Sequence, residues 1–163
     1  MLYIAADHGG FALKEEIKKY LSRLGVSYED LGAHSFIPTD DYPDVSFALA
    51  KKVASQKNAK GVLVCRSGQG ACIAANKVRG IRATQSWNQE SAKRSRNDDN
   101  SNIICLGGDF LTSKEMQSII KTWLMTPFAK LPRYKRRLKK IADYEKNRVI
   151  PSVCEESRSS KDF

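Results

Sequence analysis

A cysteine followed by a glycine-containing turn is the feature of this sequence that most clearly suggests chemistry. In LVCRSGQGACIAANK (63–77), Cys65 ends an apolar run. The turn after it consists of Arg66, Ser67, Gly68, Gln69 and Gly70. Two glycines let successive backbone N–H groups point inward, and a following helix adds unpaired donors of its own. We therefore expect an anion-binding loop at 66–70, whose positive field favours the thiolate form of Cys65, a base or nucleophile.

Two other interpretations of this stretch remain open at the level of sequence. A cysteine that ends a buried strand is often only a small core residue, and we assign Cys72 and Cys105 to that class. Alternatively, GQGACI resembles half of a dinucleotide fingerprint, with Glu90 about 20 residues further on. The third glycine of that fingerprint is missing, and the unit is not the first strand–helix pair. We therefore expect no nicotinamide or flavin cofactor.

Further polar residues stand where strands or helices are expected to end. Asp7 and His8 follow an apolar run at 2–6, and two glycines after them open a helix. A lone histidine is more often packed or on the surface, but this position favours a functional role. Arg133 and Arg137 are four residues apart, hence on one helix face. Such a pair suits phosphate, although a salt-bridged surface helix would have the same pattern.

The elements that must position these residues follow from the alternation of apolar runs and helical periodicity. We expect strands at 2–6, 26–32, 61–65, 80–85 and 102–107, and helices at 11–25, 45–56, 71–78, 88–97, 113–125 and 131–146. This pattern predicts an α/β protein: a three-layer α/β/α sandwich, Rossmann-like or flavodoxin-like, with a five-stranded mainly parallel sheet plus an extra C-terminal helix. It forms one domain over 1–148, and 149–163 is expected to be a loose tail.

Composition limits the classes of partner. The chain has 163 residues, a net charge of +10 and four cysteines without a CxxC pair or disulfide-framework spacing. Reduced thiols, no apolar stretch that could cross a bilayer and no room for a signal peptide predict a cytoplasmic protein without a membrane partner. No metal-ligand spacing is present, so we expect no metal. The basic cluster at 133–140 has only Tyr134 as an interleaved aromatic, and we do not expect nucleic acid as a partner.

An ordered set of motifs resembles a known family. The motifs are DHGGF (7–11), TDDYPD (39–44), GVLVCRSGQGACIAANKVRGIRA (61–83), SNIICLGG (101–108) and RYKRRL (133–138). Over about residues 1–145 the chain is similar to the type B ribose-5-phosphate isomerases, a family that includes galactose-6-phosphate isomerase subunits. The resemblance implies cofactor-free aldose–ketose isomerisation of a sugar phosphate through a cis-enediolate. It also implies a homodimer, which could pair further into a tetramer, with active sites shared between subunits.

The same resemblance implies a role for each matched residue. Cys65 would be the base that moves a proton between C2 and C1 of the open-chain sugar, and Ser67 would handle protons on the sugar oxygens. Backbone N–H groups of 67–70 would stabilise the enediolate. Asp7 and Tyr42 would hold sugar hydroxyls. The phosphate would be bound by His8, Arg133 and Arg137.

Three stretches depart from the family pattern. A His–Asn pair, whose histidine assists ring opening, is replaced by Asp98 and Asp99. Asp98 could act as the ring-opening group if burial raises its pKa, and Asp99 would contact substrate. The usual glycine-x-arginine reads Gly107-Gly108-Asp109, and Arg66 stands where a small residue is normal. Ribose 5-phosphate is the expected substrate; a tetrose or hexose phosphate, or a binding module without turnover, remain alternatives.

Overall fold

The computed structural model describes residues 1–147, so the predicted loose tail at 149–163 lies outside the described residues. The strands are β1 (Leu2–Ala6), β2 (Tyr28–Asp30), β3 (Lys60–Cys65), β4 (Ala83–Gln85) and β5 (Ile103–Gly107). The helices are a 3-10 turn η1 (His8–Gly10), α1 (Phe11–Arg23), α2 (Tyr42–Ala54), α3 (Gln69–Ala75), α4 (Gln89–Asn97), α5 (Ser113–Met125) and α6 (Pro132–Asn147).

The five strands form one parallel sheet in the order β2-β1-β3-β5-β4. The strand after β1 pairs on one side of it, and the next strand, β3, pairs on the other side. The direction of winding therefore reverses between β1 and β3. In sheets of this kind ligands bind beyond the carboxyl ends of the strands at that reversal. Asp7 and Cys65 stand at this point, because Ala6 pairs with Val64.

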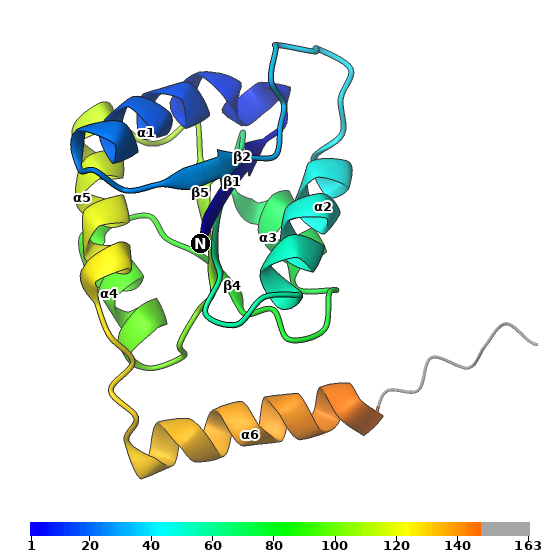
Figure 1. Cartoon of the computed structure of the whole chain (residues 1–163), viewed down its shortest axis with the longest axis vertical. Helices are drawn as coiled ribbons and strands as arrows, with labels where there is room; N and C mark the ends of the chain where they lie inside the picture. The colour runs from blue at the N-terminus through cyan, green and yellow to red at the C-terminus, as the bar shows by residue number, and fades with distance from the viewer. Residues whose placement is uncertain (148–163) are drawn as a thin grey trace, which may run out of the picture.

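Helices cover both faces of the sheet, which confirms the predicted three layers. Helices α1, α4 and α5 pack on one face, and α2 and α3 pack on the other (Figure 1). Successive strand residues face opposite layers: Val62 and Val64 contact the first set of helices, whereas Leu63 and Cys65 contact the second. Both faces are thus buried, as is usual for parallel sheets.

Some boundaries differ from the predicted ones for local reasons. Helix α2 begins at Tyr42 rather than at 45, because Asp41 is extended at the N-cap and a proline in the first turn is compatible with helix. Strand β2 is shorter than 26–32, because Val26 still donates its N–H to the carbonyl of Leu21 in the turn after α1. Helix α3 begins at Gln69 rather than at 71.

Helix α6 lies apart from the sandwich, beside the end of the sheet from which the strands start (Figure 1). The Glu145 side chain accepts a hydrogen bond from the N–H of Gly80, which precedes β4. Within helix α6, the only buried side chain is that of Tyr134. Within residues 1–147, no helix combines the length and the apolar character needed to span a bilayer.

Candidate active site

The backbone after Cys65 turns directly back onto its sulfur. Gly68 donates its N–H to Sγ of Cys65 over 3.1 Å. This contact requires glycine at position 68, because φ is +80° there and a Cβ would lie 2.9 Å from the carbonyl carbon of Leu106. An N–H aimed at sulfur binds a thiolate more strongly than a neutral thiol. The structure therefore places one backbone donor of the predicted loop, the N–H of Gly68, against the cysteine sulfur.

Asp7 lies next to this loop at the end of β1. Its Oδ1 accepts a hydrogen bond from the N–H of Gly10 over 3.0 Å, so Asp7 is the N-cap of η1. Gly10 touches the end of β3, because a Cβ there would be 2.4 Å from the carbonyl carbon of Val64. Burial raises the pKa of Asp7, against the lowering effect of the hydrogen bond from Gly10. The carboxyl is thus a fixed, buried polar group beside Cys65.

His8 is held by a carboxylate that the sequence analysis did not single out. Its Nδ1 lies 2.7 Å from Oδ1 of Asp40, and its backbone N–H donates to the same oxygen over 2.8 Å. The side-chain hydrogen bond to Asp40 raises the pKa of His8. The protonated imidazole is therefore favoured, which suits contact with an anion. Asp40 belongs to the motif TDDYPD, but sequence alone does not distinguish it from its neighbouring acids.

Tyr42 and Ser67 complete this rim of the sheet. The ring of Tyr42 covers Gly70, where a Cβ would lie 2.7 Å from Cζ of the tyrosine. The hydroxyl of Ser67 accepts a hydrogen bond from the N–H of Gln69 over 3.3 Å. Gln85, a further residue missed from the sequence, donates its side-chain amide to the carbonyl of Ser67 over 2.6 Å. Its position at the carboxyl end of strand β4 was the one feature of the sequence that could have indicated a place near the site.

Two of the departures from the family pattern contact each other. Nε of Arg66 lies 3.3 Å from Oδ2 of Asp109, and both side chains are largely exposed. The backbone N–H of Asp109 also donates to the carbonyl of Arg66 over 3.1 Å. The charge of Arg66 is therefore partly neutralised by Asp109, so Arg66 contributes less positive charge to the anion-binding loop.

The remaining predicted residues form a second cluster around the end of α4 and the start of α6. Asp98 accepts a hydrogen bond from the side-chain amide of Asn97 over 2.6 Å. That bond and another from Tyr134 lower the pKa of Asp98, together with the charges of Arg94 and Arg133. The condition stated for a ring-opening role of Asp98, a pKa raised by burial, is therefore not met, because hydrogen bonds and nearby positive charges outweigh desolvation. Partial desolvation and the adjacent charge of Asp98 instead raise the pKa of Asp99, near Arg137.

The predicted site is thus divided within one chain. One group lies at the carboxyl ends of the strands and comprises Asp7, His8, Tyr42, Cys65 and Ser67. The other lies beside the segments that lead into β4 and β5 and comprises Asp98, Asp99, Arg133 and Arg137. The two remaining described cysteines take core or near-core positions, with Cys105 fully buried and Cys72 partly buried. In the described part of the chain, no group of three acidic, histidine or cysteine side chains is placed to hold a metal.

The fold and the first group define a class: α/β proteins whose parallel sheet carries a thiol and polar side chains at its carboxyl edge. Comparison with known proteins gives the family. The chain belongs to the Ribose/Galactose Isomerase family, whose sequence model matches residues 2–141. This confirms the resemblance drawn from the motifs.

Individual relatives are similar over nearly their whole length. Ribose-5-phosphate isomerase B of Mycolicibacterium paratuberculosis is 36% identical over 152 residues, which covers 93% of this chain and 96% of that protein. A putative sugar phosphate isomerase of Bacillus subtilis is 38% identical over 146 residues, covering 90% and 97%. The crystal structure of Mycoplasma genitalium ribose-5-phosphate isomerase B with bound ribulose-5-phosphate aligns with a TM-score of 0.85 at 39% identity, covering 90% of this chain and 96% of that one.

Proposed function

We propose that this protein is an aldose–ketose isomerase that interconverts ribose 5-phosphate and ribulose 5-phosphate without a cofactor. The observation that carries the proposal is the N–H of Gly68 on the sulfur of Cys65, beside the buried Asp7, where the winding of the sheet reverses. The relative from Mycoplasma genitalium, whose structure holds ribulose-5-phosphate, supports the choice of sugar.

The thiolate of Cys65 takes the proton from C2 of the open-chain aldose, and the electron pair left behind forms a cis-enediolate. Backbone N–H groups of the 67–70 loop donate to its oxygen, where negative charge develops. The thiol then returns the proton to C1, while Ser67 passes a hydroxyl proton from O2 to O1. Atoms and charge balance, and no external oxidant is consumed. Asp7 and Tyr42 hold the remaining hydroxyls of the sugar.

The phosphate would be bound by His8 of one chain and by Arg133 and Arg137 of a second chain in a homodimer. The separation of the two groups of residues within one chain supports this arrangement, because a single copy leaves the arginines beside the opposite end of the sheet. Helix α6 also carries apolar side chains that the described residues 1–147 leave uncovered: Ile141 is 49% exposed and Tyr144 is 68% exposed.

A second candidate substrate is a shorter sugar phosphate that needs no ring opening, such as a tetrose phosphate. The lowered pKa of Asp98 favours it, because a carboxylate that stays ionised at neutral pH is a poor proton donor to a ring oxygen. We also propose a cytoplasmic location, which the unpaired thiols of Cys65, Cys72 and Cys105 support.

Proton NMR of ribose 5-phosphate in deuterated buffer tests the proposal. Wild type should produce ribulose 5-phosphate and exchange deuterium into the position next to the carbonyl. Cys65→Ala should lose activity by about 10²–10⁴-fold, the usual contribution of a general base. Cys72→Ala is the matched control and should remain active. If Cys65→Ala turned over ribose 5-phosphate at the wild-type rate, the mechanism would be contradicted. If the wild type turned over only a tetrose phosphate, the second candidate substrate would be favoured instead.

A further inference from the structure

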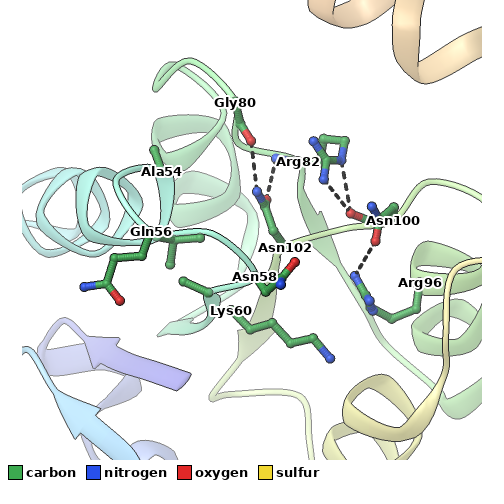
Figure 2. A pocket seen from close by; sticks show the side chains of 11 residues that line it. Ala54, Gln56, Asn58, Lys60, Gly80, Arg82, Arg96, Asn100 and Asn102 are labelled. Atoms are coloured by element: carbon green, nitrogen blue, oxygen red, sulfur yellow. Dashed lines mark hydrogen bonds between the residues drawn. The ribbon is translucent and has the colours of Figure 1, made fainter. Parts of the chain in front are cut away.

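A second polar cavity, of about 280 Å³, lies at the amino-terminal end of the sheet, opposite Cys65. Figure 2 shows it between the segments that lead into β3, β4 and β5. None of its lining residues has a role in the proposed reaction, although Arg133 and Arg137 lie near the same end of the sheet. Its volume is just below the range of about 300–1,000 Å³ that is usual for ligand pockets, so it would take a small ligand.

The lining of this cavity is strongly cationic. Three basic residues, Lys60, Arg82 and Arg96, line it from three different elements or loops, and Nζ of Lys60 donates to the carbonyl of Leu124 over 3.3 Å. The other polar lining residues are the amides Gln56, Asn58, Asn100 and Asn102. Within residues 1–147, none of the lining residues is an aspartate or a glutamate. Amides and cations together are donors suited to an anion.

The hydrogen bonds within the cavity do not neutralise these charges. Arg82 donates from Nε and Nη2 to the carbonyl of Asn100, over 3.0 and 2.9 Å. Arg96 donates from Nη1 to Oδ1 of Asn100 (Figure 2). The same Nη1 also donates to the carbonyl of Ser101. Arg96 is only 8% exposed, and its Nε is a buried donor without a partner in the described structure. A buried group left in this way costs free energy that a ligand could recover.

Electrostatic repulsion adds to that cost. Burial lowers the pKa of Lys60, and the charge of Arg96 lowers it further. Burial and the charge of Arg82 act in the same way on Arg96. Lys60 and Arg96 also lie over the same ring, with Nζ 5.5 Å and Cζ 5.8 Å from the centroid of Trp123. Glu145 of α6 is an opposing charge that acts on Arg82, but it is not among the lining residues.

We propose that this cavity is a binding site for a small phosphate-bearing anion, either inorganic phosphate or a phosphomonoester. Two guanidinium groups and an ammonium group provide the forked and point-charge donors that phosphate oxygens accept. The site is distinct from the proposed substrate site, because none of its lining residues is a proposed substrate-binding residue. It goes beyond the proposed function and does not depend on it.

Binding of an anion at this site would affect the proposed substrate site through one loop, residues 98–101. Arg82 and Arg96 hold the backbone carbonyls of Asp99, Asn100 and Ser101. The same segment begins at Asp98, a predicted substrate-site residue, so this coupling, unlike the anion site itself, rests on the proposed function. An anion that fixes both arginines therefore fixes this loop, and coupling of the two sites would be reciprocal.

Calorimetric titration of the full-length protein at constant ionic strength tests the site, with inorganic phosphate in one arm and glycerol 3-phosphate in the other. Lys60→Met keeps the aliphatic stem and removes the charge. It should weaken binding at least tenfold, as expected for one charge-assisted hydrogen bond. Lys51→Met removes an equal charge from an exposed position on α2 and is the matched control. Titrations in an Arg133→Ala/Arg137→Ala background remove two of the three proposed substrate-phosphate contacts, and His8 is the same in both variants.

Equal phosphate affinity of Lys60→Met and Lys51→Met in that background would overturn the proposal. A difference between the two arms tells free phosphate from a phosphomonoester. If Lys60→Met does not fold, acetylation of wild type provides the test: saturating phosphate should slow modification of Lys60 about tenfold and leave Lys51 unchanged. Equal rates at Lys60 with and without phosphate would contradict the site. Phosphate binding that depends on Lys60 in a protein without isomerase activity would refute only the proposed function.

Discussion

The hydrogen bond between His8 and Asp40 makes the charge of His8 dependent on a second residue. Because the pKa of His8 is raised above the ordinary 6.5, its protonated form persists to higher pH in the folded protein. The His8–Asp40 contact therefore stabilises the folded protein fully below pH 6.5, and this contribution to the free energy of unfolding is lost as the pH rises through the raised pKa of His8.

Asp40→Asn should lower the pKa of His8, and the KM for the sugar phosphate should begin to rise at a lower pH than in wild type. A proton NMR titration of the histidine ring measures the first effect, with His8→Gln used to assign the resonance. Steady-state kinetics across the same pH range measure the second. An unchanged titration in Asp40→Asn would show that the carboxylate does not set the charge of His8.

Asp98 gives a second prediction at the scale of a single residue. Since its pKa is lowered, an imidazole at this position would be a better proton donor near neutral pH. Asp98→His should raise kcat/KM for ribose 5-phosphate by on the order of tenfold. Asp98→Asn removes the charge at nearly constant size and should change it little. A large loss in Asp98→Asn would instead assign the carboxylate itself a role in the reaction.

Among the elements, the turn between β3 and α3 is the most constrained. Gly68→Ala combines a positive φ with a contact of 2.9 Å to the backbone of Leu106. Gly25→Ala has a similar φ of +67° with no atom within 4 Å, so it isolates the backbone cost of about 1–2 kcal/mol. Gly68→Ala should lower the free energy of unfolding by more than Gly25→Ala and should also abolish turnover. Urea denaturation measures the free energy of unfolding, and an activity assay measures turnover. If the two variants lost equal free energy of unfolding, the steric contact at position 68 would be contradicted.

The sequence predicted the type and order of these elements because apolar periodicity is local. It identified five strands, six helices and the loop after Cys65. It could not predict that β5 lies between β3 and β4, since pairing depends on distant segments. It also could not place Lys60, Arg82 and Arg96 together. Each looks ordinary in its own segment, and the signal, basic residues at the start of β3 and just before β4, has meaning only once the strands are aligned.

At the scale of the whole molecule, the proposed shared site predicts complementation between two inactive proteins. In a mixed dimer of Cys65→Ala and Arg137→Ala, one site carries both substitutions and the other carries neither. Random reassociation makes about half of all dimers mixed, so about a quarter of wild-type activity should return. Each variant alone and each reassociated with itself serve as controls. Failure to recover activity, with mixed dimers demonstrated by native mass spectrometry, would mean that each chain completes its own site.

The two outermost strands, β2 and β4, have three residues each, whereas the central strands have five or six. An outermost strand offers unpaired backbone groups to any passing chain, and a short one offers few. Another molecule therefore gains little by continuing this sheet, and copies that meet at high concentration must recognise each other through side chains on helices and loops. That favours specific, reversible assembly over fibril growth, and it makes refolding at high protein concentration a practical route to mixed dimers.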